Sequence, residues 1–381
     1  NQWHYFQGKF LWFDVQIMIL LLIARLVFDD ANVFSAILIL SKELPTQNWL
    51  LYKDINIIKG EITNGKDTFI AENIIQAKLN KLDVFDKFFL IKDVGFNYWS
   101  IGRGKVRGDS VGSRVLYNGN KLHEKDTPYI KGRNFHRYTG ISVDNYLRHN
   151  YNDFLNENDI FRYSAKILEV SPKIVYRQTS SKLIGTLDKN KFYCDKTVHV
   201  IINREEHSFN LKFVLGIFNS QLMNYLYNLL TEESGRTFAQ VKTINTKKLP
   251  FKVCSLGYQK QLSKLVDTAL ECGVDYSKSI ELFERYIKQQ FFIDKLSKKL
   301  QSWCDLEFSD FIKELNKVIK KVGIEKLSKL QELDWMEVFE DKKKEALFLK
   351  AEIEKTDREI NRMVYELYAL TEEEIKIVEE G

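Results

Sequence analysis

Proline is absent from residue 251 to residue 381 of the chain. This matters because proline breaks a helix from within: it lacks an N–H group and its ring clashes with the preceding turn. Apolar residues recur at spacings of three and four along the same stretch, which predicts amphipathic helices. We expect these helices at residues 259–271, 277–300, 308–321 and 334–368, with a last turn at 371–380.

Before Pro250 the pattern changes to short apolar stretches separated by turn residues. Such stretches, rich in branched and aromatic residues, predict strands. We expect strands at residues 33–40, 173–178, 183–187, 191–194 and 197–203. Residues 211–230 repeat apolar side chains at helical spacing and predict one buried helix, for which Asn210 can serve as N-cap. The predicted fold class is therefore α+β.

Charge is unevenly distributed along the chain. Residues 331–381 hold 16 acidic and 8 basic residues, a net charge of −8, whereas residues 1–330 carry a net charge of +13. A basic body with an acidic helical tail is typical of a protein that binds a polyanion, although a lysine-rich soluble protein gives the same balance. Two interpretations of the tail are open: a solvated helix, or a helix that packs against the body and screens its charge.

The cysteines and the apolar N-terminal stretch bear on where the protein works. No two of the four cysteines form a CxxC pair, and reduced cysteines are typical of the cytoplasm. Residues 11–28 are apolar but include Asp14, Gln16 and Arg25, and their unbroken apolar run is shorter than the roughly 18–20 residues that span a bilayer. We expect a cytoplasmic protein with no membrane partner.

Local catalytic motifs are missing. The chain has no GxxxxGK[ST] and no HExxH, and the spacing of its six histidines predicts no metal site. Three basic clusters stand out instead, at residues 129–138, 176–182 and 235–242. Lysine and arginine pair with phosphates, and the aromatic residues interleaved in the first cluster can stack on bases. A solvated loop with buried rings is the alternative interpretation of that cluster.

Several of these stretches occur in an order that resembles a known family. They are KIVYRQ (173–178), LIGTLD (183–188), LKFVLGIFNS (211–220), TFAQV (237–241) and Leu249-Pro250. Together they resemble the TaqI-like C-terminal specificity domain, the target-recognition domain of adenine-specific DNA methyltransferases and type IIG restriction enzymes. VFDDANVFSAILIL (27–40) is similar to the closing strands of the methylase domain in such enzymes. KTDREINRMVYELY (355–368) with LTEEEI (370–375) is similar to their C-terminal helix.

The resemblance implies domains and partners. It implies a methylase remnant at 1–45, a connecting segment at 46–92, a DNA target-recognition domain at 93–252 and a helical region at 253–381. In the family, catalysis needs [DN]PP[YF] and a glycine-rich loop for S-adenosylmethionine. No two prolines of this chain are adjacent and none precedes Asp, so neither that motif nor a PD-(D/E)xK nuclease motif is present. We therefore expect an N-terminally truncated chain that is inactive alone, binds no cofactor itself, and works with upstream methylase and possibly nuclease domains.

The expected DNA-facing residues follow from the position of the clusters within the resemblance. They are Lys131, Arg133, Arg137, Arg177, Gln178, Thr179, Lys182, Arg236 and Lys242. Two other functions fit the same sequence. The helical region could be an interaction module that docks a separate methylase or nuclease subunit, and the basic clusters could bind RNA.

Overall fold

The computed structural model describes residues 17–22, 36–41, 75–76, 78–102, 111–231 and 239–380. It divides into two compact units, residues 1–79 with 372–380, and residues 80–371. In the first unit, β1 (Ile17–Leu22) and β2 (Ala36–Ser41) pair antiparallel. The strand expected at 33–40 is thus present, shifted to β2. Apart from these two strands, the expected methylase remnant at 1–45 lies outside the described residues.

The first unit also contains the helix α12 (Glu372–Glu380), which buries Val378. The side chain of Glu374 pairs with the Lys78 ammonium at 2.8 Å. The helical turn expected at the end of the chain is confirmed by α12.

The second unit is built on a four-stranded antiparallel sheet in the order β10-β9-β12-β3. Its strands are β3 (Phe89–Asp93), β9 (Lys173–Arg177), β10 (Gly185–Asp188) and β12 (Val198–Asn203). The inner strands β9 and β12 are almost wholly buried, and their β-branched and aromatic residues suit a strand covered on both faces. The strands expected around residues 173–178, 183–187 and 197–203 are confirmed.

A second four-stranded sheet has the order β11-β6-β7-β5, in which only β11 and β6 run parallel. Its strands are β5 (Leu116–Asn118), β6 (Thr127–Ile130), β7 (Asn145–Leu147) and β11 (Tyr193–Cys194). A separate antiparallel ribbon pairs β4 (Asn97–Ser100) with β8 (Asp159–Arg162). Short helical turns join these strands: α2 (Phe85–Phe88), α3 (Val111–Val115), η1 (Gly132–Asn134), η2 (Tyr151–Phe154), α4 (Ala165–Leu168) and α7 (Thr243–Thr246).

The single helix expected at 211–230 is wrong in one respect, because it is broken at Ser220 into α5 (Leu211–Asn219) and α6 (Gln221–Leu230). Ser220 has extended backbone angles, and its hydroxyl accepts the Met223 N–H at 3.2 Å as the N-cap of α6. Asn210 caps α5 as expected, with its side chain accepting the Lys212 N–H.

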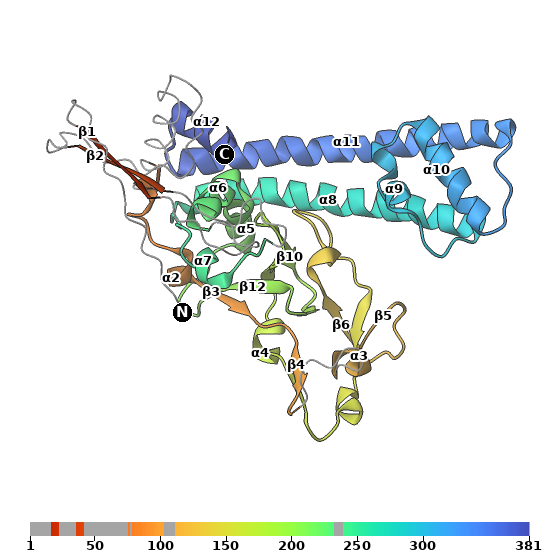
Figure 1. Ribbon diagram of the computed structural model, residues 1–381, viewed down its shortest axis with the longest axis horizontal. Coiled ribbons are helices and arrows are strands. Elements are labelled where there is room, and N and C mark those ends of the chain that lie inside the picture. The colour runs from red at the N-terminus through yellow and green to blue at the C-terminus, as the bar shows by residue number, and fades with distance from the viewer. Residues whose placement is uncertain are drawn as a thin grey trace. The chain divides into compact units, whose positions relative to one another are not determined.

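Two long antiparallel helices, α8 (Leu256–Phe291) and α11 (Lys329–Leu367), lie side by side and dominate the C-terminal part of the second unit (Figure 1). The sequence predicted a break between residues 271 and 277, but α8 runs through it. The helix ends instead at Phe292, which has a left-handed conformation with φ of 50°. The α11 helix begins before the expected residue 334, because Ser328 and Gln331 form a capping box there.

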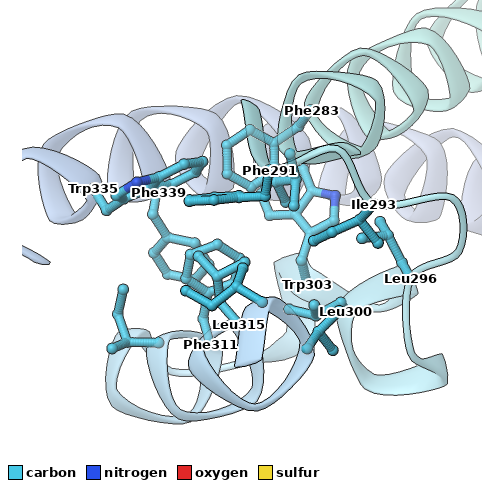
Figure 2. Packing of buried hydrophobic residues seen from close by; sticks show 14 of the residues in the cluster. Phe283, Phe291, Ile293, Leu296, Leu300, Trp303, Phe311, Leu315, Trp335 and Phe339 are labelled. Carbon is cyan, nitrogen blue, oxygen red and sulfur yellow. The ribbon is translucent and has the colours of Figure 1, made fainter. Parts of the chain in front are cut away.

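At the distal end of the two long helices, α9 (Lys298–Gln301), η3 (Trp303–Asp305) and α10 (Phe308–Lys321) close a separate apolar core (Figure 1). Figure 2 shows Trp303 and Phe311 among the buried rings of this core. The ring of Trp303 lies 4.4 Å from that of Phe283, and the ring of Phe311 lies 4.6 Å from that of Phe339. The helix α10 has the bounds that the sequence predicted.

The expected α+β class is confirmed, with strands before Pro250 and helices after it. None of the helices in the described part of the chain carries an apolar stretch of the length that a bilayer crossing requires.

Candidate nucleic-acid interface

Hydrogen bonds bring the three basic clusters together at one end of the β10-β9-β12-β3 sheet, and main-chain bonds join the second cluster to the third. The Gln178 N–H donates to the Thr197 carbonyl at 2.8 Å, and the Val241 N–H donates to the Gln178 carbonyl at 2.7 Å. Thr179 and Gln240 form an isolated antiparallel bridge. We call residues 131–137, 177–182 and 240–242 the basic edge.

The first cluster joins this edge through Gly132 and Arg177. The Gly132 N–H donates to the Thr197 hydroxyl at 2.9 Å. The guanidinium of Arg177 donates two hydrogen bonds to the Phe135 carbonyl, one of them at 3.0 Å from Nε. Burial lowers the pKa of Arg177. The side chain of Arg177 therefore fixes the position of the loop at 131–137, which gives it a structural role within the edge.

Arg137 is also held by a protein partner. It forms an ion pair with Asp357 of α11, and its guanidinium lies 5.4 Å from the ring centroid of Tyr138. Burial raises the pKa of Asp357, while the neighbouring Arg137 opposes that change. This ion pair links the loop at 131–137 to the long helix α11.

Other predicted residues are more exposed. The side chain of Arg133 is 58% exposed. Its guanidinium pairs with the Asp144 carboxylate at 2.8 Å, and this ion pair faces solvent. The ammonium of Lys131 lies 5.6 Å from the Tyr129 ring. Thr179, Lys182 and Lys242 are exposed, and Gln178 is half-buried. Arg236 lies outside the described residues.

The aromatic residues of the first cluster are not available to stack on bases. Tyr129, Phe135 and Tyr138 are each 2% exposed or less. Tyr129 packs against Phe96 at a ring distance of 5.1 Å, and Phe135 belongs to the core beneath the main sheet. The prediction that these three rings stack on nucleic acid is therefore wrong, and the alternative of buried rings is correct.

Sequence reasoning missed the β4–β8 ribbon, which presents an aromatic and a cationic side chain together. Trp99 is 44% exposed, and the Arg162 guanidinium lies 5.4 Å from its ring centroid. Asn97 pairs with Arg162 in the register, so Asn97, Trp99 and Arg162 share one face. Asparagine and arginine are the side chains that read adenine and guanine edges, and a two-stranded ribbon fits the major groove. The adjacent aromatic residues Tyr98 and Trp99 were the available sequence signal for a strand.

The sequence that contains these segments matches a family model. Residues 127–251 match the family model of the TaqI-like C-terminal specificity domain. This segment is similar to that specificity domain. The resemblance expected from the sequence is thereby confirmed for these residues, which include the whole basic edge.

The helical region matches a second family model, described as a domain of unknown function (DUF8810), over residues 256–364. No curated protein matches the chain. Among solved structures, it is similar to that of the Type IIL restriction-modification enzyme MmeI in complex with DNA, at 8% identity and a TM-score of 0.37. That match covers 75% of this chain and 34% of the other, so the chain spans about a third of that protein's length.

Proposed function

We propose that the chain recognises a double-stranded DNA target as the specificity part of a restriction-modification enzyme. The observation that carries this proposal is the basic edge: three cationic clusters, separate in sequence, are brought together within a TaqI-like specificity domain. Lysine and arginine side chains along such an edge neutralise phosphates, and polar side chains beside them read base edges.

The proposal extends to the chemistry of the parent enzyme. That enzyme transfers a methyl group from S-adenosylmethionine to an adenine amino group, and the catalytic motif resides in methylase domains outside this chain. The support is the family resemblance together with the absence of adjacent prolines in the sequence. This chain would then bind DNA in the cytoplasm without modifying it.

The first test is the salt dependence of duplex DNA binding, measured by fluorescence anisotropy with the full chain. If about six to eight phosphates are contacted, affinity should fall roughly a thousandfold or more between about 50 and 200 mM salt. A salt-independent curve, or no binding at about 50 mM salt, contradicts the proposal. A competing duplex RNA that displaces the DNA equally well would favour RNA as the ligand.

A charge-removing substitution locates the binding surface. Lys182 is exposed beside Thr179 in the basic edge, so Lys182→Ala should weaken binding to all sequences and lower the salt slope by about 1. Lys313→Ala is the matched control, because Lys313 is an equally exposed lysine on α10 of the distal helices. If the two substitutions weaken DNA binding equally, binding depends on the net charge of the chain and not on the basic edge.

A second candidate function is docking of a separate methylase or nuclease subunit by the helical region. Exposed apolar side chains on these helices favour it, notably Phe292 at 87%, Leu330 at 71% and Phe348 at 65%. Co-purification with a methylase polypeptide that is lost in Leu330→Ser and Phe348→Ser variants would support this function. If the chain binds DNA by itself and does not co-purify with the methylase polypeptide, this docking function is excluded.

A further inference from the structure

Two histidines and an aspartate that are distant in sequence meet at one end of the second sheet. His123 and Asp126 lie in the turn between β5 and β6, and His149 lies two residues beyond β7. Both β5 and β6 pair with β7, so the turn and the strand end converge. One nitrogen or oxygen ligand atom from each residue lies within 4.8 Å of those of the other two. The separation of these histidines in sequence concealed this group when spacing alone was considered.

Asp126 supplies a buried negative charge to the group. Its carboxylate accepts hydrogen bonds from the Tyr117 hydroxyl, from the His123 N–H at 3.1 Å and from the His149 N–H at 2.9 Å. These bonds hold the carboxylate in place at the centre of the group. Carboxylate oxygen is a common ligand of zinc and other divalent metal ions.

The two imidazoles lie over this carboxylate, near the surface. Their ring centroids are 4.0 Å apart and the rings are nearly parallel, with an interplanar angle of 21°. Nδ1 of His149 lies 2.9 Å from Oδ1 of Asp126, so the imidazole and the carboxylate are adjacent groups that one ion can bind together. The Lys125 N–H, at 3.1 Å from Nδ1, orients the ring of His123. Both histidines are exposed whereas Asp126 is buried, so a cation has access to the group from solvent.

We propose that His123, Asp126 and His149 bind one divalent transition-metal ion, with Zn²⁺ as the best match and water completing its coordination. Two imidazoles with one carboxylate suit zinc, cobalt, nickel or copper, whereas magnesium and calcium prefer oxygen ligands alone. Zinc–ligand bonds of about 2.0–2.1 Å place neighbouring tetrahedral ligands roughly 3.4 Å apart. The ligand atoms lie within 4.8 Å of one another, so reaching this spacing takes a movement of at most about 1.4 Å. Rotation of the exposed His123 side chain can supply that movement.

The ion would tie the β5–β6 turn to the end of β7. Asp126 already joins these two segments through Tyr117 and the main chain of His149. A ligand that binds only the folded state adds to stability by mass action. The role inferred for the metal is therefore structural, and it does not depend on whether the basic edge binds DNA.

The test is a calorimetric titration of the metal-stripped full chain with ZnCl₂, with Co²⁺ absorption as a second probe of imidazole ligation. We expect one ion per chain and a rise in melting temperature with Zn²⁺. His123→Ala and His149→Ala should each weaken Zn²⁺ binding by roughly tenfold or more, and the double variant should abolish the stoichiometric site. Circular dichroism would show that the variants remain folded.

His136→Ala is the matched control, because His136 is an exposed histidine of the same domain outside the group. It should bind Zn²⁺ as the unmodified chain does. The proposal is overturned if the unmodified chain shows no saturable binding at micromolar Zn²⁺, if the double variant still binds one ion with the same affinity, or if the control loses as much affinity as the ligand variants.

Discussion

Gly273 lies in the middle of α8, where glycine is an unfavourable choice for a helix. The reason is its neighbour: a Cβ atom built at Gly273 would lie 2.0 Å from the carbonyl oxygen of Tyr138. The helix therefore touches the loop that follows the basic edge, backbone against backbone. The sequence suggested a helix break near this glycine, but glycine here permits a close approach and the helix continues.

Substitution of Gly273 should therefore destabilise the protein. In Gly273→Ala the added methyl group meets backbone, which cannot move aside as a flexible side chain can, and overpacking of this kind costs about 1–3 kcal/mol or more. The gain in helix propensity, about 1 kcal/mol at most, does not offset it. Urea denaturation would measure the free energy of unfolding.

The same substitution elsewhere in α8 provides the control. At Gly257 a Cβ atom would meet only the Ser255 hydroxyl at 4.0 Å, so Gly257→Ala should be neutral or stabilising by about 0.4–1 kcal/mol. Equal unfolding free energies for the two variants would show that the contact with Tyr138 is not tight in solution.

The arginines show which part of a site a sequence can predict. The clusters around Arg137 and Arg177 could be identified because charge and family order are visible in the sequence. Their partners were not visible: Arg177 donates to the Phe135 carbonyl and Arg137 pairs with Asp357. An exposed phosphate ligand and an internal hydrogen-bond donor look alike until the fold brings a carbonyl or a carboxylate to them.

At the scale of the elements, the spacing of apolar residues did not predict the break between α5 and α6. Apolar spacing continues through Ser220, so the pattern predicts one helix. The break lets the preceding residue, Asn219, bond the main chain of Gly185 in both directions, accepting from its N–H at 2.9 Å and donating to its carbonyl at 3.0 Å. The Asn-Ser pair within the family-like stretch thus fastens α5 to strand β10, a long-range contact that no local pattern records.

The β4–β8 ribbon should be sensitive to acid. Asp159 opens β8, and its carboxylate accepts hydrogen bonds from the Ser100 hydroxyl, from the Asn156 N–H at 2.7 Å and from Arg114 at 2.6 Å. The first of these is the largest cause that lowers the pKa of Asp159 to about 2. Because the folded pKa lies below the unfolded value of about 3.9, the contribution to stability is complete above that value and is lost as the pH falls toward about 2.

Replacing the carboxylate should remove this part of the acid response. Asp159→Asn should lose less stability than the unmodified chain between about pH 5 and pH 2, a window that spans the unfolded pKa, as measured by urea denaturation at each pH. Asp153→Asn is the control, since Asp153 is an exposed aspartate in the neighbouring η2 turn. An unchanged pH profile in Asp159→Asn would contradict the assigned hydrogen bonds.

At the scale of the whole molecule, the acidic helix α11 contacts the basic edge within the second unit. In the described residues, this contact includes the ion pair between Asp357 of α11 and Arg137. A single ion pair is a local interaction and does not screen the charge of the whole domain. Deleting residues from 353 onward would not test it, because Ile360 and Val364 of that stretch are buried and their loss would disrupt the fold. A single change of charge is the cleaner experiment.

Asp357→Asn keeps the size of the side chain and removes its charge, so Arg137 is no longer held by an anion. If Arg137 belongs to the DNA-facing surface, affinity for duplex DNA at low salt should rise roughly two- to tenfold and the salt slope should steepen by up to about 1, as expected for one more phosphate contact. Glu354→Gln changes the net charge equally from an exposed position one turn away on α11, and should raise affinity less. Equal affinities in the two variants would mean that Arg137 only holds α11 in place and does not contact DNA. The phosphate contacts of the basic edge would then come from other residues, such as Arg133 and Lys182.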